Sequence, residues 1–385
     1  MGQRVTVYAP MGTLDHQTGI LNAIRCFAAA GYEVDVMTVR NRRYTPTQFT
    51  QPNVKLHWMP LATFDSEPEP RWAATLLFVD WAAWRALWNP PRLVFAGGIR
   101  GLLAAWSVSL LRRLAYINYQ TELYIGAKLD TKLARLVKAV ERRAAQKALL
   151  TIEHDPQRCE LLCADLGVPR DRVVVVPNAP VGPAHALVST FLHERLQLPL
   201  DTPLLVCPGT LGDTFQSRQV VMAAQSLPEP WRCIMHSAQP RTDDEPYIRE
   251  LRALNTAGRV VFSLAPIPYS DIDRLMASAR AGIVLYASEL GQNTATVGLA
   301  SGKLSHFLKI GVPVIVSPLP GLADFVREHG VGEVLERPEQ LPELLARIDA
   351  DAAGYRERAL KTFDQELSYE RHFSAVLQRV AAVGC

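Results

Sequence analysis

The sequence predicts an α/β protein with two doubly wound domains, each a parallel sheet covered by helices. Three observations support this prediction. Short apolar runs alternate with helical patterns along the chain, which is typical of βαβ units. The alternation stops near residues 180–202, where prolines cluster, and then begins again. The chain has 385 residues, which is long enough for two domains with separate cores.

The first half opens with a β-turn-α-β unit. Residues 5–8 form an apolar strand, and a turn that contains Gly12 follows it. The helical pattern of residues 19–30 ends at Gly31, a typical C-terminal signal. Residues 132–147 predict a charged amphipathic helix. The other strands of this half are expected at residues 34–39, 55–59, 93–95, 115–119, 149–152 and 173–176.

The second half repeats the pattern and ends in a helix, roughly residues 369–383. We expect a first domain over residues 1–182, a second over residues 200–365, and a linker near residues 180–202. The strands of the second half are expected at residues 204–207, 232–235, 260–262, 283–286 and 314–316.

Composition and charge indicate a globular protein with an uneven charge distribution. Hydrophobic residues make up 48% and charged residues 21% of the chain. The net charge is +3, but residues 1–180 hold 22 Lys and Arg against 15 Asp and Glu. This excess suits an acidic membrane surface or a phosphate-bearing acceptor, or has no partner at all. The six cysteines lack paired zinc-ligand spacing, which predicts free thiols in a reducing cytoplasm.

The segment from residue 300 to 318, ASGKLSHFLKIGVPVIVSP, is the most informative part of the chain. Ser301 is a good helix N-cap, and Gly302 permits close approach to the backbone. Lys303 places a cation beside the free amides and the positive dipole of a helix N-terminus, an arrangement that suits a phosphate or diphosphate. Gly311 ends the short helix, and an apolar strand follows. An ordinary helix-to-strand turn is the alternative.

The same segment resembles the donor-binding signature of GT-B fold glycosyltransferases, in the large retaining group called family four. It is most similar to the members that build bacterial surface polysaccharides. Three further segments agree in order and spacing. Residues 172–180, RVVVVPNAP, resemble the end of the family's first domain. Residues 204–211, LLVCPGTL, resemble the first strand and glycine turn of the second, and residues 283–286 resemble the strand before the donor loop.

The resemblance implies two Rossmann-like domains that face each other across a cleft. It implies that residues 366–385 cross back to the first domain, that the first domain binds the acceptor, and that the second binds a nucleotide-sugar. The reaction would move a sugar to a hydroxyl of a glycan or lipid-linked glycan in polysaccharide biosynthesis. A GT-B nucleotide-sugar epimerase, which needs no acceptor, and a non-catalytic GT-B partner subunit are the alternatives.

The resemblance also assigns residues to the donor site. Lys303 is the expected diphosphate ligand, and Arg218 and Glu289 are further catalytic candidates. Thr210 stands where relatives often carry the first residue of a basic pair, and Arg218 is displaced along the chain, so a surface arginine is equally compatible. Tyr269 would stack on the base or merely pack. The donor-binding candidates are Gly12, Gly209, Thr210, Tyr269, Asn293, Thr294, Gly298, Ser301, Gly302 and His306.

One departure from the family pattern concerns two glutamates that relatives carry seven residues apart. Counted back from Gly311, these positions hold Gly298 and His306. Several polysaccharide-type relatives also lack the first glutamate. The second usually bonds the ribose hydroxyls, and a neutral imidazole still accepts a hydrogen bond. A structural histidine on the helix is the alternative.

On the first domain, Asp15, His16 and Glu122 are the acceptor-site candidates. No metal and no cofactor are expected, and the co-substrate would be a UDP- or GDP-sugar. Asp271 and Asp273 match an Asp-x-Asp spacing, but Ser270 and Asp271 precede a helix, so capping explains them better than metal binding.

A tryptophan-rich stretch of the first domain raises the question of membrane contact. Trp81, Trp84 and Trp88 recur at helical spacing, and a later apolar stretch ends at Arg112 and Arg113. Such helices lie in a membrane interface, form a core, or contact a second copy. Burial is favoured here. The expected location is the cytoplasm, with contact to the inner face of the membrane as the second expectation, and no nucleic-acid partner is expected.

Overall fold

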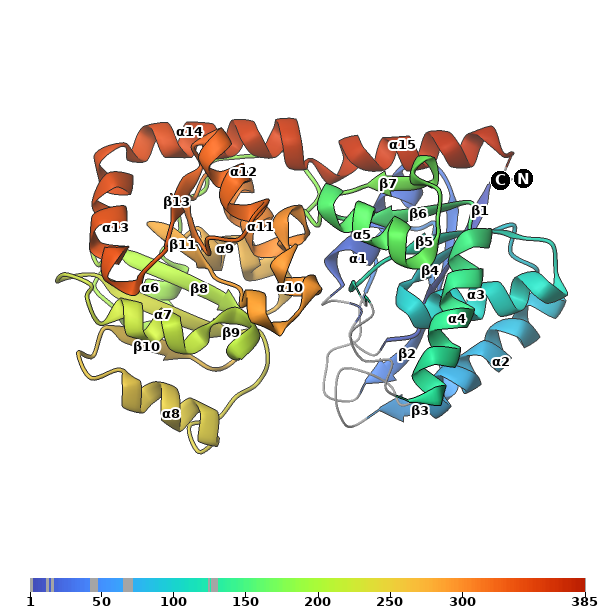
Figure 1. The fold of residues 1–385 in the computed structure, drawn as a ribbon, viewed down its shortest axis with the longest axis horizontal. Helices are drawn as coiled ribbons and strands as arrows, with labels where there is room; N and C mark the ends of the chain where they lie inside the picture. The colour runs from blue at the N-terminus through green and yellow to red at the C-terminus, as the bar shows by residue number, and fades with distance from the viewer. Residues whose placement is uncertain are drawn as a thin grey trace. The chain divides into compact units, whose positions relative to one another are not determined.

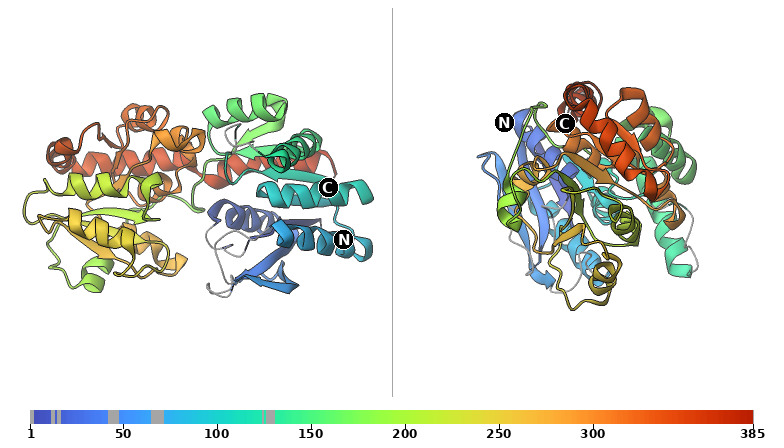
Figure 2. Two further views of the ribbon diagram at one scale, coloured as in Figure 1. Left: turned by 60° about the horizontal axis from the view of Figure 1, so that its bottom comes forward. Right: turned by 90° about the vertical axis from the view of Figure 1, so that its left-hand side faces the viewer.

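The computed structural model describes residues 3–11, 14, 17–41, 48–64, 72–123, 125 and 131–384, and it divides into two compact units (Figure 1). The N-terminal domain combines Met1–Val181 with Tyr369–Cys385, and the C-terminal domain is Gly182–Ser368. Each domain is a parallel sheet with helices on both faces (Figure 2). The predicted doubly wound α/β architecture is therefore confirmed.

The sheet of the N-terminal domain has seven strands in the order β3-β2-β1-β4-β5-β6-β7, and all neighbours are parallel. The sequence predicted all seven, although β3 runs to Phe64 rather than ending near residue 59. The strands are β1 (Arg4–Ala9), β2 (Glu33–Asn41), β3 (Val54–Phe64), β4 (Leu93–Gly97), β5 (Ala115–Tyr119), β6 (Leu150–Glu153) and β7 (Val173–Val175).

Strand β4 shows why these strands appear as continuous apolar runs. Leu93 and Phe95 belong to the core on one face of the sheet, and Val94 and Ala96 to the core on the other. Both faces are covered, so every side chain of the strand is buried. The helices of this domain are α1 (Thr18–Ala29), α2 (Trp72–Trp88), α3 (Gly98–Leu111), α4 (Lys132–Lys147), α5 (Pro156–Leu166) and α15 (Tyr369–Ala382).

The C-terminal helix α15 packs on the N-terminal domain, as the sequence predicted. It shares one core with α1, whereas α2 to α5 cover the opposite face of the sheet. The hydroxyl of Tyr369 donates to the carbonyl of Gly19 at 2.8 Å. The rings of Phe373 and Phe27 meet edge to face with centroids 5.2 Å apart. These buried aromatic contacts hold the end of the chain on the first domain.

The sheet of the C-terminal domain has six parallel strands in the order β10-β9-β8-β11-β12-β13. Strand β13 was not predicted, because three half-buried residues carry no apolar pattern. The predicted strand at residues 283–286 lies two residues earlier, as β11. The strands are β8 (Leu204–Gly209), β9 (Arg232–Ser237), β10 (Val260–Ser263), β11 (Ala281–Val284), β12 (Val314–Val316) and β13 (Gly332–Val334).

The segment expected to be a proline-rich linker is part of the C-terminal domain and carries helix α6, so that expectation was wrong. Leu192 of α6 is fully buried, and its backbone amide donates to Ser278 Oγ at 3.1 Å. The helices of this domain are α6 (Phe191–Leu196), α7 (Ser217–Ala224), α8 (Pro246–Leu254), α9 (Ile272–Met276), α10 (Gln292–Ala295), α11 (Gly302–Lys309), α12 (Leu322–His329), α13 (Leu341–Ala350) and α14 (Ala352–Thr362).

Candidate active site

The strand order of the C-terminal domain reverses between β8 and β11, where the chain has built outward first on one side and then on the other. Open α/β sheets bind ligands at this switch point, beyond the carboxyl ends of the strands. Gly209 ends β8, and Tyr286 lies two residues after β11. The candidate active site lies at this point.

Helix α11 begins beside the switch point with the predicted cap. Ser301 Oγ accepts a hydrogen bond from the amide of Leu304 at 3.3 Å, and the Tyr286 hydroxyl lies 2.8 Å from the same oxygen. The first amides of a helix have no partner within it, so those of Gly302 and Lys303 mark a positively polarised end. Gly311, with a φ of 76°, follows the end of the helix as predicted.

Lys303 extends from α11 across the end of β8. A Cβ atom placed on Gly209 would lie 2.7 Å from Cε and 3.1 Å from Nζ of Lys303. The φ of Gly209 is 113°, a region that favours glycine. The absence of a side chain at Gly209 is therefore what gives the lysine its place at the switch point.

The ammonium group of Lys303 lies against two aromatic rings. Its Nζ is 4.0 Å from the ring centroid of Phe215 and 5.7 Å from that of Tyr286. Burial lowers the pKa of Lys303 below its ordinary value, and no carboxylate of the described residues pairs with it. The rings stabilise the cation in part. A desolvated cation beside free helix amides is an arrangement that accepts an anion such as a diphosphate.

A second polar cluster lies one turn further along α11. His306 Nδ1 is 3.0 Å from Asp273 Oδ1, and its Nε2 is 3.3 Å from the hydroxyl of Tyr269. Lys309 Nζ lies 3.5 Å from the other oxygen of Asp273. Burial pushes the pKa of Asp273 upward, but the hydrogen bond from His306 and the charges of His306 and Lys309 outweigh it, so this pKa lies below its ordinary value.

This cluster corrects the expectation that Asp271 caps a helix, and it adds detail to the expectations for His306 and Tyr269. Asp271 precedes α9, but its side chain makes no capping bond, and its carboxylate lies 3.4 Å from Arg274 instead. The two carboxylate oxygens of Asp273 contact His306 and Lys309. Asp273 holds the proton of His306 on Nδ1, which leaves Nε2 as the acceptor facing Tyr269. The buried imidazole and Tyr269 are thus brought together, and their place in donor binding stays a prediction.

We expect Asp273→Asn to lower the free energy of unfolding of the C-terminal domain by about 1–3 kcal/mol at neutral pH, because the variant loses the charged acceptor of the His306 N–H and of the Lys309 ammonium. The folded pKa of Asp273 is depressed, so its contribution is present above about pH 4 and is lost as the pH falls through the lowered value. Urea denaturation across this range measures both effects. Asp271→Asn is the control, and an equal loss in both variants would contradict the prediction.

Arg218 is a half-buried residue at the start of α7. Its Nε donates to Glu250 at 2.5 Å, it pairs with Asp213, and its guanidinium stacks on the ring of Tyr247 at 4.7 Å. Hydrogen bonding to Glu250 raises the pKa of Arg218. These contacts connect α7 to α8 and to the turn that carries Phe215, and the place of Arg218 in the donor site stays a prediction.

The other predicted donor residues follow the chain between β11 and α11, apart from Thr210, which is half-buried directly after Gly209. Glu289 is exposed, and Asn293 is half-buried. Thr294 is buried, and its hydroxyl donates to the carbonyl of Gly291 at 3.0 Å. Gly298 is buried with a φ of 26°. Of these predicted residues of the loop, Glu289 is the exposed one.

On the N-terminal domain, Gly12, Asp15 and His16 lie outside the described residues. Glu122 is exposed just after β5, at the carboxyl edge of the sheet. The backbone beside it is fixed, because His154 Nε2 is 2.8 Å from the carbonyl of Gln120 and His154 Nδ1 is 2.8 Å from that of Val176. The buried imidazole holds the ends of β5, β6 and β7 together.

Two residues of the site were not predicted from the sequence. Phe215 and Tyr286 form the aromatic surroundings of Lys303, with ring centroids 5.6 Å apart. Tyr286 was noted only as the end of a strand, and Phe215 lies in a polar turn. The available signal was an aromatic residue in the turn after each of the two strands at the switch point.

Comparison with protein families finds two matches, one in each part of the chain. Residues 16–179 match the glycosyl transferase 4-like domain. Residues 282–380 match the glucosyltransferase 3-like, C-terminal domain, a range that includes Lys303 and His306. Among curated protein sequences no relative matches the chain.

Solved structures share the fold along the whole chain. A sucrose-phosphate synthase from Thermosynechococcus elongatus superposes with a TM-score of 0.76 at 15% identity, covering 99% of each chain. HepE of Anabaena, in a complex with UDP and glucose, superposes with a TM-score of 0.74 at 14% identity, covering 99% of this chain and 100% of its own. WaaG, a glycosyltransferase of lipopolysaccharide biosynthesis, gives 0.68 at 16% identity, covering 97% and 98%.

Two doubly wound domains, with the C-terminal helix returned to the first, define the GT-B class of fold. The families matched in both parts of the chain are glycosyltransferase families, and they agree with the predicted GT-B glycosyltransferase of the family-four-like kind. The predicted enzyme class is therefore confirmed.

Proposed function

We propose that this enzyme moves a sugar from a UDP- or GDP-sugar to a hydroxyl of a glycan or lipid-linked glycan, with retention of configuration and without a metal ion. The observation that carries the proposal is the position of Lys303 over Gly209, beside the first amides of α11. HepE, which shares the fold, has been solved with UDP and glucose and with UDP-glucose. This supports a nucleotide-sugar as the donor.

The chemical role of Lys303 depends on the stage of the reaction at which negative charge develops on the donor. As the bond from sugar to phosphate breaks, negative charge grows on the departing diphosphate. A preorganised, desolvated ammonium interacts more strongly with that product-like charge than with the intact donor, which lowers the barrier rather than only the KM. The helix amides add further positive potential. Together they can supply the charge stabilisation for which other transferases use a metal ion.

The acceptor is proposed to bind to the N-terminal domain, where Glu122 is exposed at the carboxyl edge of the sheet. A cytoplasmic location is part of the proposal. The free thiols of the described cysteines Cys26, Cys159, Cys163, Cys207 and Cys233 support it, because they suit a reducing compartment.

Calorimetric titration with UDP, GDP, CMP and dTDP in the presence of EDTA tests the donor site. We expect one nucleotide to bind, and Lys303→Ala to weaken that binding at least about tenfold, because the charge-assisted contact is lost. The anomeric configuration of the product, read by NMR, tests retention. Nucleotide-sugar turnover without an acceptor would indicate an epimerase. No binding of any nucleotide would favour a non-catalytic subunit.

A further inference from the structure

Exposed apolar side chains gather where α2 and α3 end. Trp88 is the most exposed of them, at 79%. The sequence favoured burial for the tryptophans of this stretch, and that expectation was wrong for Trp84 and Trp88. We call the following exposed residues the apolar patch: Trp84, Leu87, Trp88, Leu110 and Leu111.

The core does not need these residues. Helix α2 packs on the sheet through Phe78, Ala82 and Ala86, which are at most 2% exposed, on the opposite side of the helix from Trp84 and Trp88. When a helix is apolar on both sides, the domain core covers one of them and the other stays exposed to solvent. Contiguous exposed apolar surface of this kind marks an interaction site.

The two helix ends belong to one surface. Helices α2 and α3 pack side by side, and Arg112 Nη2 donates to the carbonyl of Leu87 at 3.4 Å. This bond brings the end of α3, with Leu110 and Leu111, next to the end of α2, with Trp88. None of the helices in the described part of the chain is both long and apolar enough to span a bilayer.

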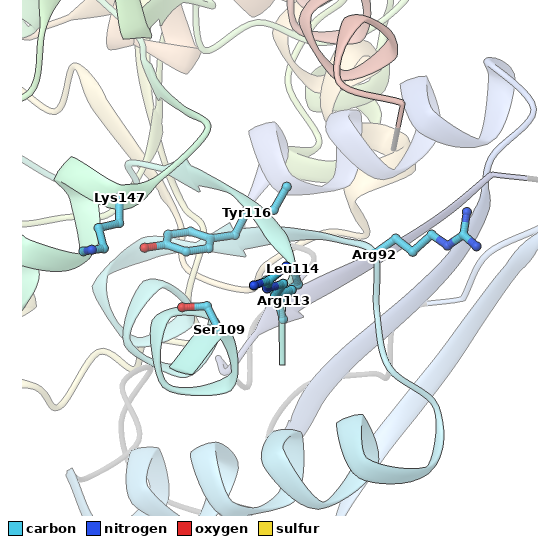
Figure 3. Close-up of a pocket in the computed structure, with 7 residues that line it drawn as sticks. Arg92, Ser109, Arg113, Leu114, Tyr116 and Lys147 are labelled. Atoms are coloured by element: carbon cyan, nitrogen blue, oxygen red, sulfur yellow. The ribbon is translucent and has the colours of Figure 1, made fainter. Parts of the chain in front are cut away.

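Cations follow the residues of the apolar patch along the chain, because Arg92 stands four residues after Trp88 and Arg113 two residues after Leu111. Arg92, Arg113 and Lys147 line an open pocket of about 580 Å³ that includes Ser109 (Figure 3). They stand just before β4, β5 and β6, three adjacent strands. Figure 3 shows Arg92 and Lys147 extending to opposite sides of Arg113. Positive charge spread along an edge suits a layer of anionic head groups better than a single bound anion.

We propose that this surface docks the N-terminal domain onto an anionic lipid bilayer. The tryptophans and leucines of the apolar patch enter the interfacial region, where indole rings are favoured. Arg92, Arg112, Arg113 and Lys147 lie among the phosphates of the head groups, where each basic residue adds to the attraction. A second copy fits less well, because a two-fold contact would set these cations against themselves.

The surface is separate from the acceptor edge. It lies at the amino ends of β4, β5 and β6, whereas Glu122 follows the carboxyl end of β5. Docking therefore anchors the enzyme without using catalytic groups, and it does not depend on the proposed donor or acceptor. Activity on soluble substrates should be unchanged when docking is lost.

Vesicle co-sedimentation of the full-length protein tests the proposal. We expect binding to phosphatidylcholine vesicles that contain phosphatidylglycerol, and much weaker binding to phosphatidylcholine alone. The double variant Trp84→Ser, Trp88→Ser should bind at least about tenfold more weakly, because two interfacial anchors are lost. The matched control is Met222→Ser, Leu290→Ser, which changes two exposed apolar residues of the C-terminal domain.

The electrostatic part is tested by Arg113→Glu. The control is Arg249→Glu, which reverses the charge of an exposed residue of α8. Reversing one charge at the head-group layer should weaken binding about tenfold, and added salt should reduce the difference. Absence of binding to anionic vesicles at low salt would overturn the proposal. Equal binding by all variants would overturn it too. The same holds if the wild type does not bind vesicles and instead forms a dimer that the double tryptophan variant does not form.

Discussion

Replacement of Lys303 by alanine is expected to lower kcat for sugar transfer by about 10³-fold, with the fold retained. The ammonium lies at the switch point, held over Gly209 and against Phe215. Its removal takes away a preorganised interaction that strengthens as the diphosphate departs. Steady-state kinetics with the donor identified by calorimetry, together with circular dichroism, measures the effect.

The matched control is Lys361→Ala, which removes an exposed lysine from α14. It should leave both kcat and KM within about twofold of the wild type, because an exposed charge is screened by solvent and contributes little. Full activity of Lys303→Ala would refute the assignment of the site. Loss of activity together with loss of folded structure would be resolved by Lys303→Met, which keeps the apolar part of the side chain against Phe215.

The lowered pKa of Lys303 adds a pH dependence to this prediction. The free enzyme loses the ammonium below the ordinary lysine value of about 10.4, so kcat/KM should fall on the alkaline side. A bound diphosphate restores the cation, so the alkaline limb of kcat should lie at higher pH. Between the two pKa values the unfolded state binds more protons, so stability without ligand rises with pH, and Lys303→Ala removes this rise.

Gly209→Ala is expected to lower kcat/KM about 10²-fold, because a misplacement of about 1 Å in a positioning group has effects of this size. The new methyl group would lie 2.7 Å from Cε of Lys303, so the lysine must move. The backbone also has a φ of 113°, which costs a non-glycine residue about 1–3 kcal/mol. Kinetics and urea denaturation separate the two effects.

Gly212→Ala is the control in the same loop. Its φ is 177°, an extended conformation that any residue adopts, and no atom lies within 4 Å of the added methyl group. We expect near wild-type kinetics and stability. If both glycine variants lose activity equally, the loop as a whole is sensitive, and the specific contact of Gly209 with Lys303 is not what matters.

The sequence alone determined most of the architecture, because its strands are buried on both faces. The strand at residues 115–119 and the helix at residues 132–147 were predicted to the residue. The cap at Ser301 and the helix end at Gly311 were also predicted, since both depend on local hydrogen bonding and backbone conformation. The position of Lys303 at a helix start was likewise visible in the sequence.

Only the tertiary structure decided which side chains meet at these positions. Phe215 and Lys303 are far apart in the sequence and meet because β8 and β11 are neighbours at the switch point. The partner of Asp273 was not predicted, because a capping pattern is local and the bond to His306 is not. The helical spacing of Trp88 would be the same in a buried and in an exposed position. Trp88 is exposed because the side of α2 that packs in the core is the one that carries Phe78, Ala82 and Ala86.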